Sequence, residues 1–297
     1  MTAEMTLVHV TEAVAVMLAA GLAALVAMAR GNLRALAAHV WFKRWCTWSV
    51  IAAVILGALA LGGPAPALMV AVMAWQAARE AASLLGLPPA YRRALVAAAP
   101  LTVVASRVAP DALPWLPGAF ALLVILLPLA RGKVDAPSDA GRALLGYIWT
   151  AWLPAFIVRL GAAEHGVPWL MTLGLAVALA DVFACVVGSR VGGPKLAPAI
   201  SPGKTWSGLA GSVAGAYVAF AAFAFLHPTA PPVLYWGLPP VVALAGTVGD
   251  LLESWVKRAA GVKDAGAWLP GFGGLLDRID STLVALPLAW LVLRLVG

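Results

Sequence analysis

A series of long apolar runs, separated by short charged or proline-containing segments, is the sequence feature that most limits how this chain can fold. Of the 297 residues, 63% are hydrophobic and only 11% are charged, whereas soluble domains are closer to half apolar and a quarter charged. A protein interior cannot bury this much apolar surface, so lipid must cover much of it. Runs of about 20 residues predict helices that cross roughly 30 Å of hydrocarbon. The sequence therefore predicts an all-α, polytopic helical integral membrane protein.

The apolar runs predict about nine or ten transmembrane helices, some of them short enough to need accommodation by tilt or by neighbouring helices. They lie near residues 7–29, 46–62, 65–84, 94–110, 117–130, 144–162, 168–188, 207–226, 233–249 and 281–296.

The distribution of basic residues predicts the orientation of these helices. If the N-terminus lies outside and every run crosses the membrane, the lysines and arginines fall inside except for Arg107, Arg159 and Arg294. Cytoplasmic loops of membrane proteins carry such an excess of basic residues. The same rule accounts for the net charge of +7 without a nucleic-acid partner. It also places the polar segments 189–206 and 250–280 together on the cytoplasmic face.

The charges that topology does not explain gather in the last third of the chain. We therefore divide the chain into N-terminal transmembrane helices, residues 1–165, and a C-terminal catalytic transmembrane region, residues 166–297. Cys46 and Cys185 lie far apart in or beside apolar runs, which predicts packing roles rather than a disulfide or a zinc site. The sequence contains no internal repeat that would support an inverted-repeat transporter.

The segment 250–281 is rich in carboxylates for the edge of a membrane. Four of its polar residues recur at helical spacing and should share one helix face: Asp250, Glu253, Ser254 and Lys257. Carboxylates at the start of a helix can have the simpler role of complementing the helix dipole. Here, however, four would repel one another without a cation between them: Asp250, Asp264, Asp277 and Asp280. Such oxygen ligands suit Mg²⁺, which shares its coordination shell with substrate phosphates.

A second polar segment precedes the apolar run at 207–226. Asp181 lies inside an apolar run, where an unpaired charge costs at least a few kcal/mol; a buried structural hydrogen bond is its alternative role. Lys195 and Lys204 bracket a proline-rich loop, and Ser201 and Thr205 add hydroxyls just before the next run. Backbone N–H groups at a helix start can bind an anion, although the full pattern of a nucleotide-binding P-loop is absent. The two segments together predict phosphoryl or nucleotidyl transfer at a membrane surface.

These motifs resemble those of the phosphatidate cytidylyltransferases, the CDP-diacylglycerol synthases. The family signature is close to S-x-x-K-R-x4-K-D-x-G-x3-P-G-H-G-G-x-x-D-R-x-D. The matching positions here are Ser254, Lys257, Arg258, Lys263, Asp264, Gly266, Pro270, Gly271, Gly273, Gly274, Asp277, Arg278 and Asp280. The upstream ISPGKTWSG is similar to S-P-K-K-T-W-E-G of the family, and Asp181 and Gly188 match its D-x-x-A-Y-x-x-G. The resemblance covers residues 180–281.

The resemblance implies an enzyme that condenses CTP with phosphatidic acid, or a related lipid phosphate, to give CDP-diacylglycerol and pyrophosphate. It implies Mg²⁺ held by Asp250 and Asp277, with Asp264 and Asp280 nearby, and leaves open whether a second cation binds. Its implied location is a bacterial-type inner (plasma) membrane with the active site facing the cytoplasm. A homodimer has no sequence support.

The residues implied by this resemblance fall into two sets. The catalytic set is Asp250, Lys257, Arg258, Lys263, Asp264, Asp277, Arg278 and Asp280, of which the basic members would neutralise phosphates. The substrate-binding set is Asp181, Lys195, Ser201, Lys204, Thr205, Ser254, Gly273 and Gly274.

The sequence departs from the family pattern at a few positions. Phe272 stands where the family has histidine, Ser207 replaces a glutamate and Gly203 a lysine. If the histidine orients a substrate phosphate, Phe272 predicts a slower enzyme or one that takes a different lipid phosphate. Since the metal-site aspartates are intact, we expect an active enzyme.

Two other functions are weighed against this one. A CTP-dependent lipid-alcohol kinase would use the same donor but release CDP and a lipid phosphate. A cation-coupled transporter should line a path through the membrane midplane with acids, whereas most acids here lie at one membrane edge.

Overall fold

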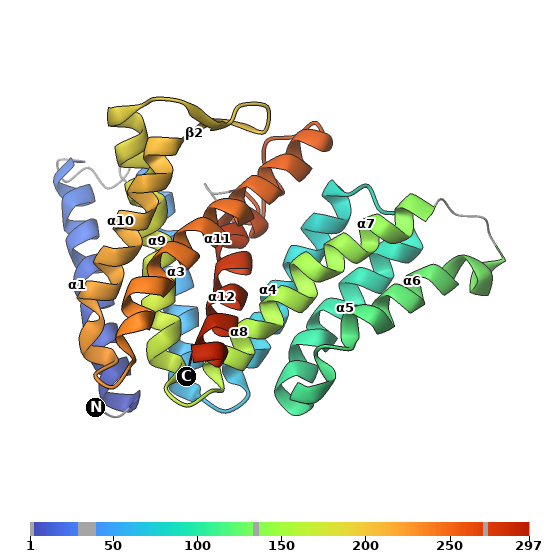
Figure 1. Ribbon diagram of the computed structural model, residues 1–297, viewed down its shortest axis with the longest axis horizontal. Helices are drawn as coiled ribbons and strands as arrows, with labels where there is room; N and C mark the ends of the chain where they lie inside the picture. Colours follow the sequence, from blue (N-terminus) through green and yellow to red (C-terminus); the bar gives the residue numbers. More distant parts are fainter. Residues whose placement is uncertain (1–2, 29–39, 133–136, 270–272, 297) are drawn as a thin grey trace.

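The computed structural model describes residues 3–28, 40–132, 137–269 and 273–296, and it is helical apart from one short hairpin (Figure 1). The long helices are α1 (Ala3–Met28), α3 (Val40–Leu61), α4 (Ala65–Leu84), α5 (Pro89–Val108), α6 (Leu116–Arg131), α7 (Pro137–Tyr147), α8 (Leu153–Gly161), α9 (Gly166–Val191), α10 (Trp206–Ala222), α11 (Pro232–Ala259) and α12 (Leu276–Val296). Short helical pieces lie at η1 (Pro110–Ala112), η2 (Ile148–Trp152) and η3 (Ala224–Leu226). The prediction of an all-α, polytopic membrane protein is confirmed.

Four helices in the described part of the chain are long and apolar enough to cross a membrane. They are α9, α11, α12 and the continuous rod 137–161, in which the π-helical piece η2 joins α7 to α8. Helices α6 and α10 are apolar but shorter. Every predicted apolar run overlaps one of the observed helices, while the predicted number of nine or ten crossings stays a prediction.

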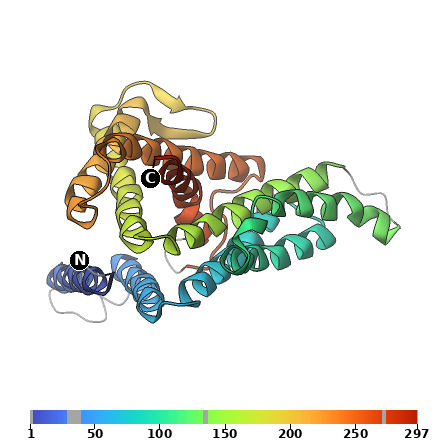
Figure 2. The same cartoon turned by 60° about the horizontal axis from the view of Figure 1, so that its bottom comes forward.

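The helices pack around two buried clusters of apolar side chains. One cluster joins α4, α5, α6 and the 137–161 rod, and the other joins α8, α9, α10, α11 and α12. Helix α1 packs mainly along α3 at the periphery (Figures 1 and 2). Val256, Leu276 and Leu283 belong to the first cluster although they lie on α11 and α12. The C-terminal end of α11 and the start of α12 are therefore packed against the N-terminal half of the protein.

Small residues let the helices that carry the polar motifs approach closely. A Cβ atom at Gly215 of α10 would lie 2.4 Å from the Leu179 carbonyl oxygen of α9, and one at Gly249 of α11 would lie 2.3 Å from the Asp280 carbonyl oxygen of α12. Since backbone atoms cannot yield to a methyl group at such distances, glycine is required at both positions. The Gly249 contact brings the neighbouring Asp250 to the helix that carries Asp280.

We expect Gly249→Ala to destabilise the protein by about 1–3 kcal/mol or more, because the added methyl group must push α11 away from α12. The matched control is Gly237→Ala in the same helix, where a Cβ atom would meet nothing within 4 Å. That change should leave the melting temperature in detergent unchanged or slightly raised. Equal losses in the two variants would show that α11 and α12 do not depend on this contact.

The proline-rich segment before α10 forms a two-stranded antiparallel hairpin of β1 (Lys195–Ala197) and β2 (Ser201–Thr205). Lys195 pairs with Thr205, and Ala197 pairs with Ser201. The Thr205 hydroxyl accepts a hydrogen bond from the Gly208 N–H at 3.0 Å and so caps α10. The hairpin lies at the end of the molecule opposite both chain termini (Figure 1).

Candidate active site

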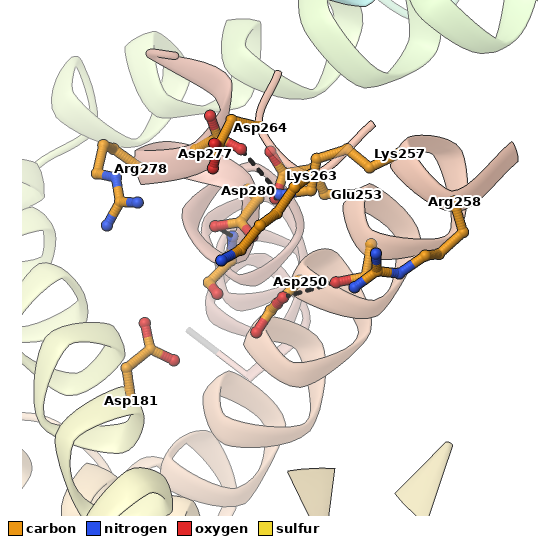
Figure 3. Close-up of a pocket in the computed structure, with 12 residues that line it drawn as sticks. Asp181, Asp250, Glu253, Lys257, Arg258, Lys263, Asp264, Asp277, Arg278 and Asp280 are labelled. Carbon is orange, nitrogen blue, oxygen red and sulfur yellow. Dashed lines mark hydrogen bonds and ion pairs between the residues drawn. The ribbon is translucent and has the colours of Figure 1, made fainter. Parts of the chain in front are cut away.

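A polar cavity of about 360 Å³ opens between α9, α11 and α12 and the loop 260–275 that joins the last two (Figure 3). Its lining is formed by Asp181, Asp250, Glu253, Ser254, Lys257, Arg258, Lys263, Asp264, Asp277, Arg278, Asp280 and Ser281. The whole predicted catalytic set lies in this lining, together with two members of the predicted substrate-binding set, Asp181 and Ser254. The structure therefore brings together residues from three separate parts of the sequence.

Three carboxylates converge inside the cavity. Asp250, Glu253 and Asp280 each offer an oxygen atom, and these atoms lie within 4.8 Å of one another. Asp250 and Glu253 are neighbours because they are three residues apart on α11, and the Gly249 contact adds Asp280 from α12. Glu253 is only 2% exposed, and its Oε1 atom has no hydrogen-bond partner among the described residues. A buried carboxylate oxygen without a donor is costly unless a cation approaches it or the group takes up a proton.

Lys257 lies at the centre of the buried charges. Its Nζ atom donates to Glu253 Oε2 and to Asp277 Oδ1, both at 2.8 Å (Figure 3). The side chains of Glu253 and Asp277 are 2% and 3% exposed. One lysine therefore bridges two buried carboxylates that come from different helices, and its charge offsets one of their two negative charges.

Asp277 holds the described residues of the loop 260–275 in place. Besides Lys257, its carboxylate accepts the N–H of Ala265 at 3.0 Å and the N–H of Gly274 at 2.7 Å. Gly273 has a φ of +87°, and a Cβ atom there would lie 2.9 Å from Asp277 Oδ2. A glycine is therefore needed at 273 for both backbone conformation and space. Asp277 faces the cavity but lies outside the group of three converging carboxylates, so its predicted role as a metal ligand stays a prediction, as does that of Asp264.

The β1–β2 hairpin is attached to the same cavity. Lys204 forms an ion pair with Asp250, with 2.5 Å between Nζ and Oδ2, and Arg258 Nε donates to the Ile200 carbonyl at 3.4 Å. Ser254 donates to Asp250 Oδ1 at 3.3 Å. Several residues that the sequence assigned to substrate binding do not line the cavity: Lys195, Ser201, Thr205, Gly273 and Gly274. Thr205 instead caps α10.

Basic side chains surround the outer part of the cavity. Arg258, Lys263 and Arg278 are exposed while lining it, and Asp264 is exposed beside them. Asp181 enters from α9, away from the other carboxylates (Figure 3). The site therefore combines buried carboxylates, which can bind a cation, with exposed cations, which can bind phosphate oxygens.

Two glutamates at the site were absent from the predicted set. Glu253 shares a helix face with Asp250, and that spacing was visible in the sequence. Glu80, on α4, accepts the N–H of Leu275 at 3.1 Å and the N–H of Leu276 at 2.8 Å. No sequence pattern links Glu80 to residues so far along the chain. Pro270, Gly271 and Phe272, which carry part of the predicted motif and its main departure, lie outside the described residues.

Comparisons with known proteins agree with the family resemblance seen in the sequence motifs. Residues 42–296 match the sequence model of the cytidylyltransferase family. The chain is similar to the protein named phosphatidate cytidylyltransferase of Mycobacterium bovis, with 36% identity over 158 residues, or 53% of this chain and 52% of the relative. For the Brucella abortus protein of the same name the identity is 42% over 134 residues, or 44% and 48%. The chain thus spans about half the length of the curated relatives it matches.

Proposed function

Because this chain belongs to the cytidylyltransferase family, we propose that it transfers the cytidylyl group of CTP to phosphatidic acid at the cytoplasmic surface of a bacterial-type inner membrane. The observation that carries the proposal is the cavity itself, in which buried carboxylates lie beside exposed basic side chains. The names of the similar proteins support phosphatidic acid as the acceptor. The excess of basic residues around the hairpin end supports the cytoplasmic orientation.

The three converging carboxylates fit a divalent cation. No donor among the described residues reaches the buried Oε1 atom of Glu253, and a bound cation would satisfy this atom. Carboxylate oxygens are the ligands that Mg²⁺ prefers. We propose that Asp250, Glu253 and Asp280 would hold Mg²⁺, which when bound supplies positive charge next to the CTP phosphates.

The reaction requires two anions to meet. A phosphate oxygen of the lipid attacks the α-phosphorus of CTP, and the bond from that phosphorus to the bridging oxygen of the β-phosphate breaks, so that pyrophosphate leaves with the bonding electrons. Arg258, Lys263 and Arg278 are placed to bind phosphate oxygens at the cavity mouth and to lower the repulsion between the two substrates. Lys257 keeps Glu253 and Asp277 in position.

The test is a product assay on the purified protein with labelled CTP, Mg²⁺ and phosphatidic acid in mixed micelles. We expect a CDP-lipid and pyrophosphate in equal amounts, and no product when the divalent cation is chelated. A panel of other lipid phosphates measures substrate preference. Formation of CDP and a newly phosphorylated lipid from a lipid alcohol would instead identify a kinase, and no CDP-lipid from any lipid phosphate would disprove the proposal.

A further inference from the structure

Glu80 binds the start of α12 from the other half of the chain. It lies on α4, is 6% exposed and does not line the cavity. Its Oε1 atom accepts the N–H of Leu275, and its Oε2 atom accepts the N–H of Leu276, which is the first residue of α12. The first N–H groups of a helix have no partner within the helix. A carboxylate is well suited to them because it also complements the positive end of the helix dipole.

The Glu80 carboxylate is itself held in place. Gln76, one turn earlier on α4, donates to Glu80 Oε1 at 2.9 Å, and Arg79 donates to the Gln76 side chain at 3.3 Å. A charged group in an apolar helix is expensive unless it is fully satisfied. These contacts, together with the two N–H groups of α12, meet that requirement.

Two glycines of the loop 260–275, Gly266 and Gly274, lie close against this carboxylate. A Cβ atom at Gly274 would lie 2.7 Å from Glu80 Oε2 and 2.8 Å from the Gly266 nitrogen. The atoms nearest to a Cβ atom at Gly266 would all belong to Glu80, with Oε1 at 3.0 Å and Cδ at 3.2 Å. Since its hydrogen bonds prevent the carboxylate from moving aside, both glycines are needed for the loop to approach it.

We infer that Glu80 is a positioning residue for the reaction, because it determines where the first turn of α12 presents Asp277 and Asp280 to the cavity. Three consecutive N–H groups are involved: Asp277 accepts that of Gly274, and Glu80 accepts those of Leu275 and Leu276. Loss of Glu80 leaves the last two N–H groups unsatisfied and frees the helix start. The catalytic part of this inference rests on the proposed function, whereas the structural part does not.

The first experiment compares Glu80→Gln with Glu164→Gln, the same change at an exposed glutamate. Hydrogen exchange in the peptide 274–281 should rise in Glu80→Gln while most other peptides keep their protection. The kcat for CDP-lipid should fall by about 10–100-fold, as for other residues that orient metal ligands, with a smaller change in the KM for CTP. Glu164→Gln should change neither quantity. If Glu80→Gln leaves both at the wild-type level, or if exchange rises throughout the protein, the inference is overturned.

The second experiment approaches the same contact from the loop. Gly266→Ala should raise exchange in 274–281 and lower kcat in the wild-type chain, but add little in a Glu80→Ala chain, because the atoms nearest to its methyl group belong to Glu80. Additive effects of the two substitutions would contradict the inference. A Gly266→Ala chain that behaves like wild type would also contradict it, and this second test does not require the Glu80→Ala chain to fold. If the wild-type protein makes no CDP-lipid, the proposed function fails while the exchange data still decide the role of Glu80.

Discussion

Replacing Asp280 by asparagine is expected to lower kcat/KM for CDP-lipid formation by about 10³-fold or more, since the stabilisation supplied by a bound metal amounts to several kcal/mol. Asparagine has nearly the same shape as aspartate, so the packing of α12 against α11 should persist. What is lost is one of the three converging carboxylates, the other two being those of Asp250 and Glu253. Glu253→Gln should cause a loss of similar size, although the sequence motif does not include this residue.

The control for these variants is Asp111→Asn, which makes the same chemical change at an exposed position outside the cavity. It should retain wild-type activity. The variants should also elute as folded protein from a sizing column and melt near the wild-type temperature. If Asp280→Asn keeps even a tenth of the wild-type rate, Asp280 does not hold a catalytic cation.

Replacing Lys257 by methionine is expected to lower the free energy of unfolding by about 3–5 kcal/mol, because it leaves buried carboxylates without the lysine ammonium group that pairs with them. Glu253 and Asp277 each accept a hydrogen bond from Lys257 at 2.8 Å. Methionine keeps the length and the apolar packing of the side chain. The free energy of unfolding, measured by denaturant titration in mixed micelles, is therefore the quantity to compare.

Lys263→Met provides the matched control, since Lys263 lines the same cavity but is exposed. It should change stability by about 0.5 kcal/mol or less, as surface substitutions usually do. Lys263 is proposed to bind phosphate and Lys257 to hold two carboxylates in position. Either substitution should lower activity, so a loss of activity alone would not separate their roles. Equal stability of the two variants would show that the Lys257 ion pairs contribute nothing net to the fold.

Much of the architecture could be predicted from the sequence because it depends on local patterns. Length and hydrophobicity determine where membrane helices form, and each predicted run does overlap a helix. Helical spacing likewise predicted that Asp250 and Glu253 share a face. The predicted helix boundaries were less accurate where a helix tolerates proline. The apolar run was predicted at 233–249, whereas α11 runs unbroken from Pro232 to Ala259 through Pro239 and Pro240. The hairpin between α9 and α10 was expected only as a loop.

The details of the site depend on contacts between distant segments, which one sequence does not reveal. The motif grouped Asp250, Asp264, Asp277 and Asp280 as metal ligands, and spacing cannot tell which of them meet. In the folded chain, Lys257 and two backbone N–H groups bind Asp277, and Glu253 takes a place among the converging carboxylates. Glu80 reaches the site from α4 across 195 residues of sequence. Its role follows only from the way the two halves of the chain pack.

We propose that Asp250, Glu253 and Asp280 together bind a divalent cation, and this binding can be measured directly. Mn²⁺ prefers the same oxygen ligands as Mg²⁺ and its free fraction can be followed by electron paramagnetic resonance. We predict saturable Mn²⁺ binding by the purified wild-type protein and by Glu164→Gln, and a loss of that binding in Glu253→Gln. Undiminished Mn²⁺ binding in a folded Glu253→Gln protein would show that these three carboxylates do not form the cation site.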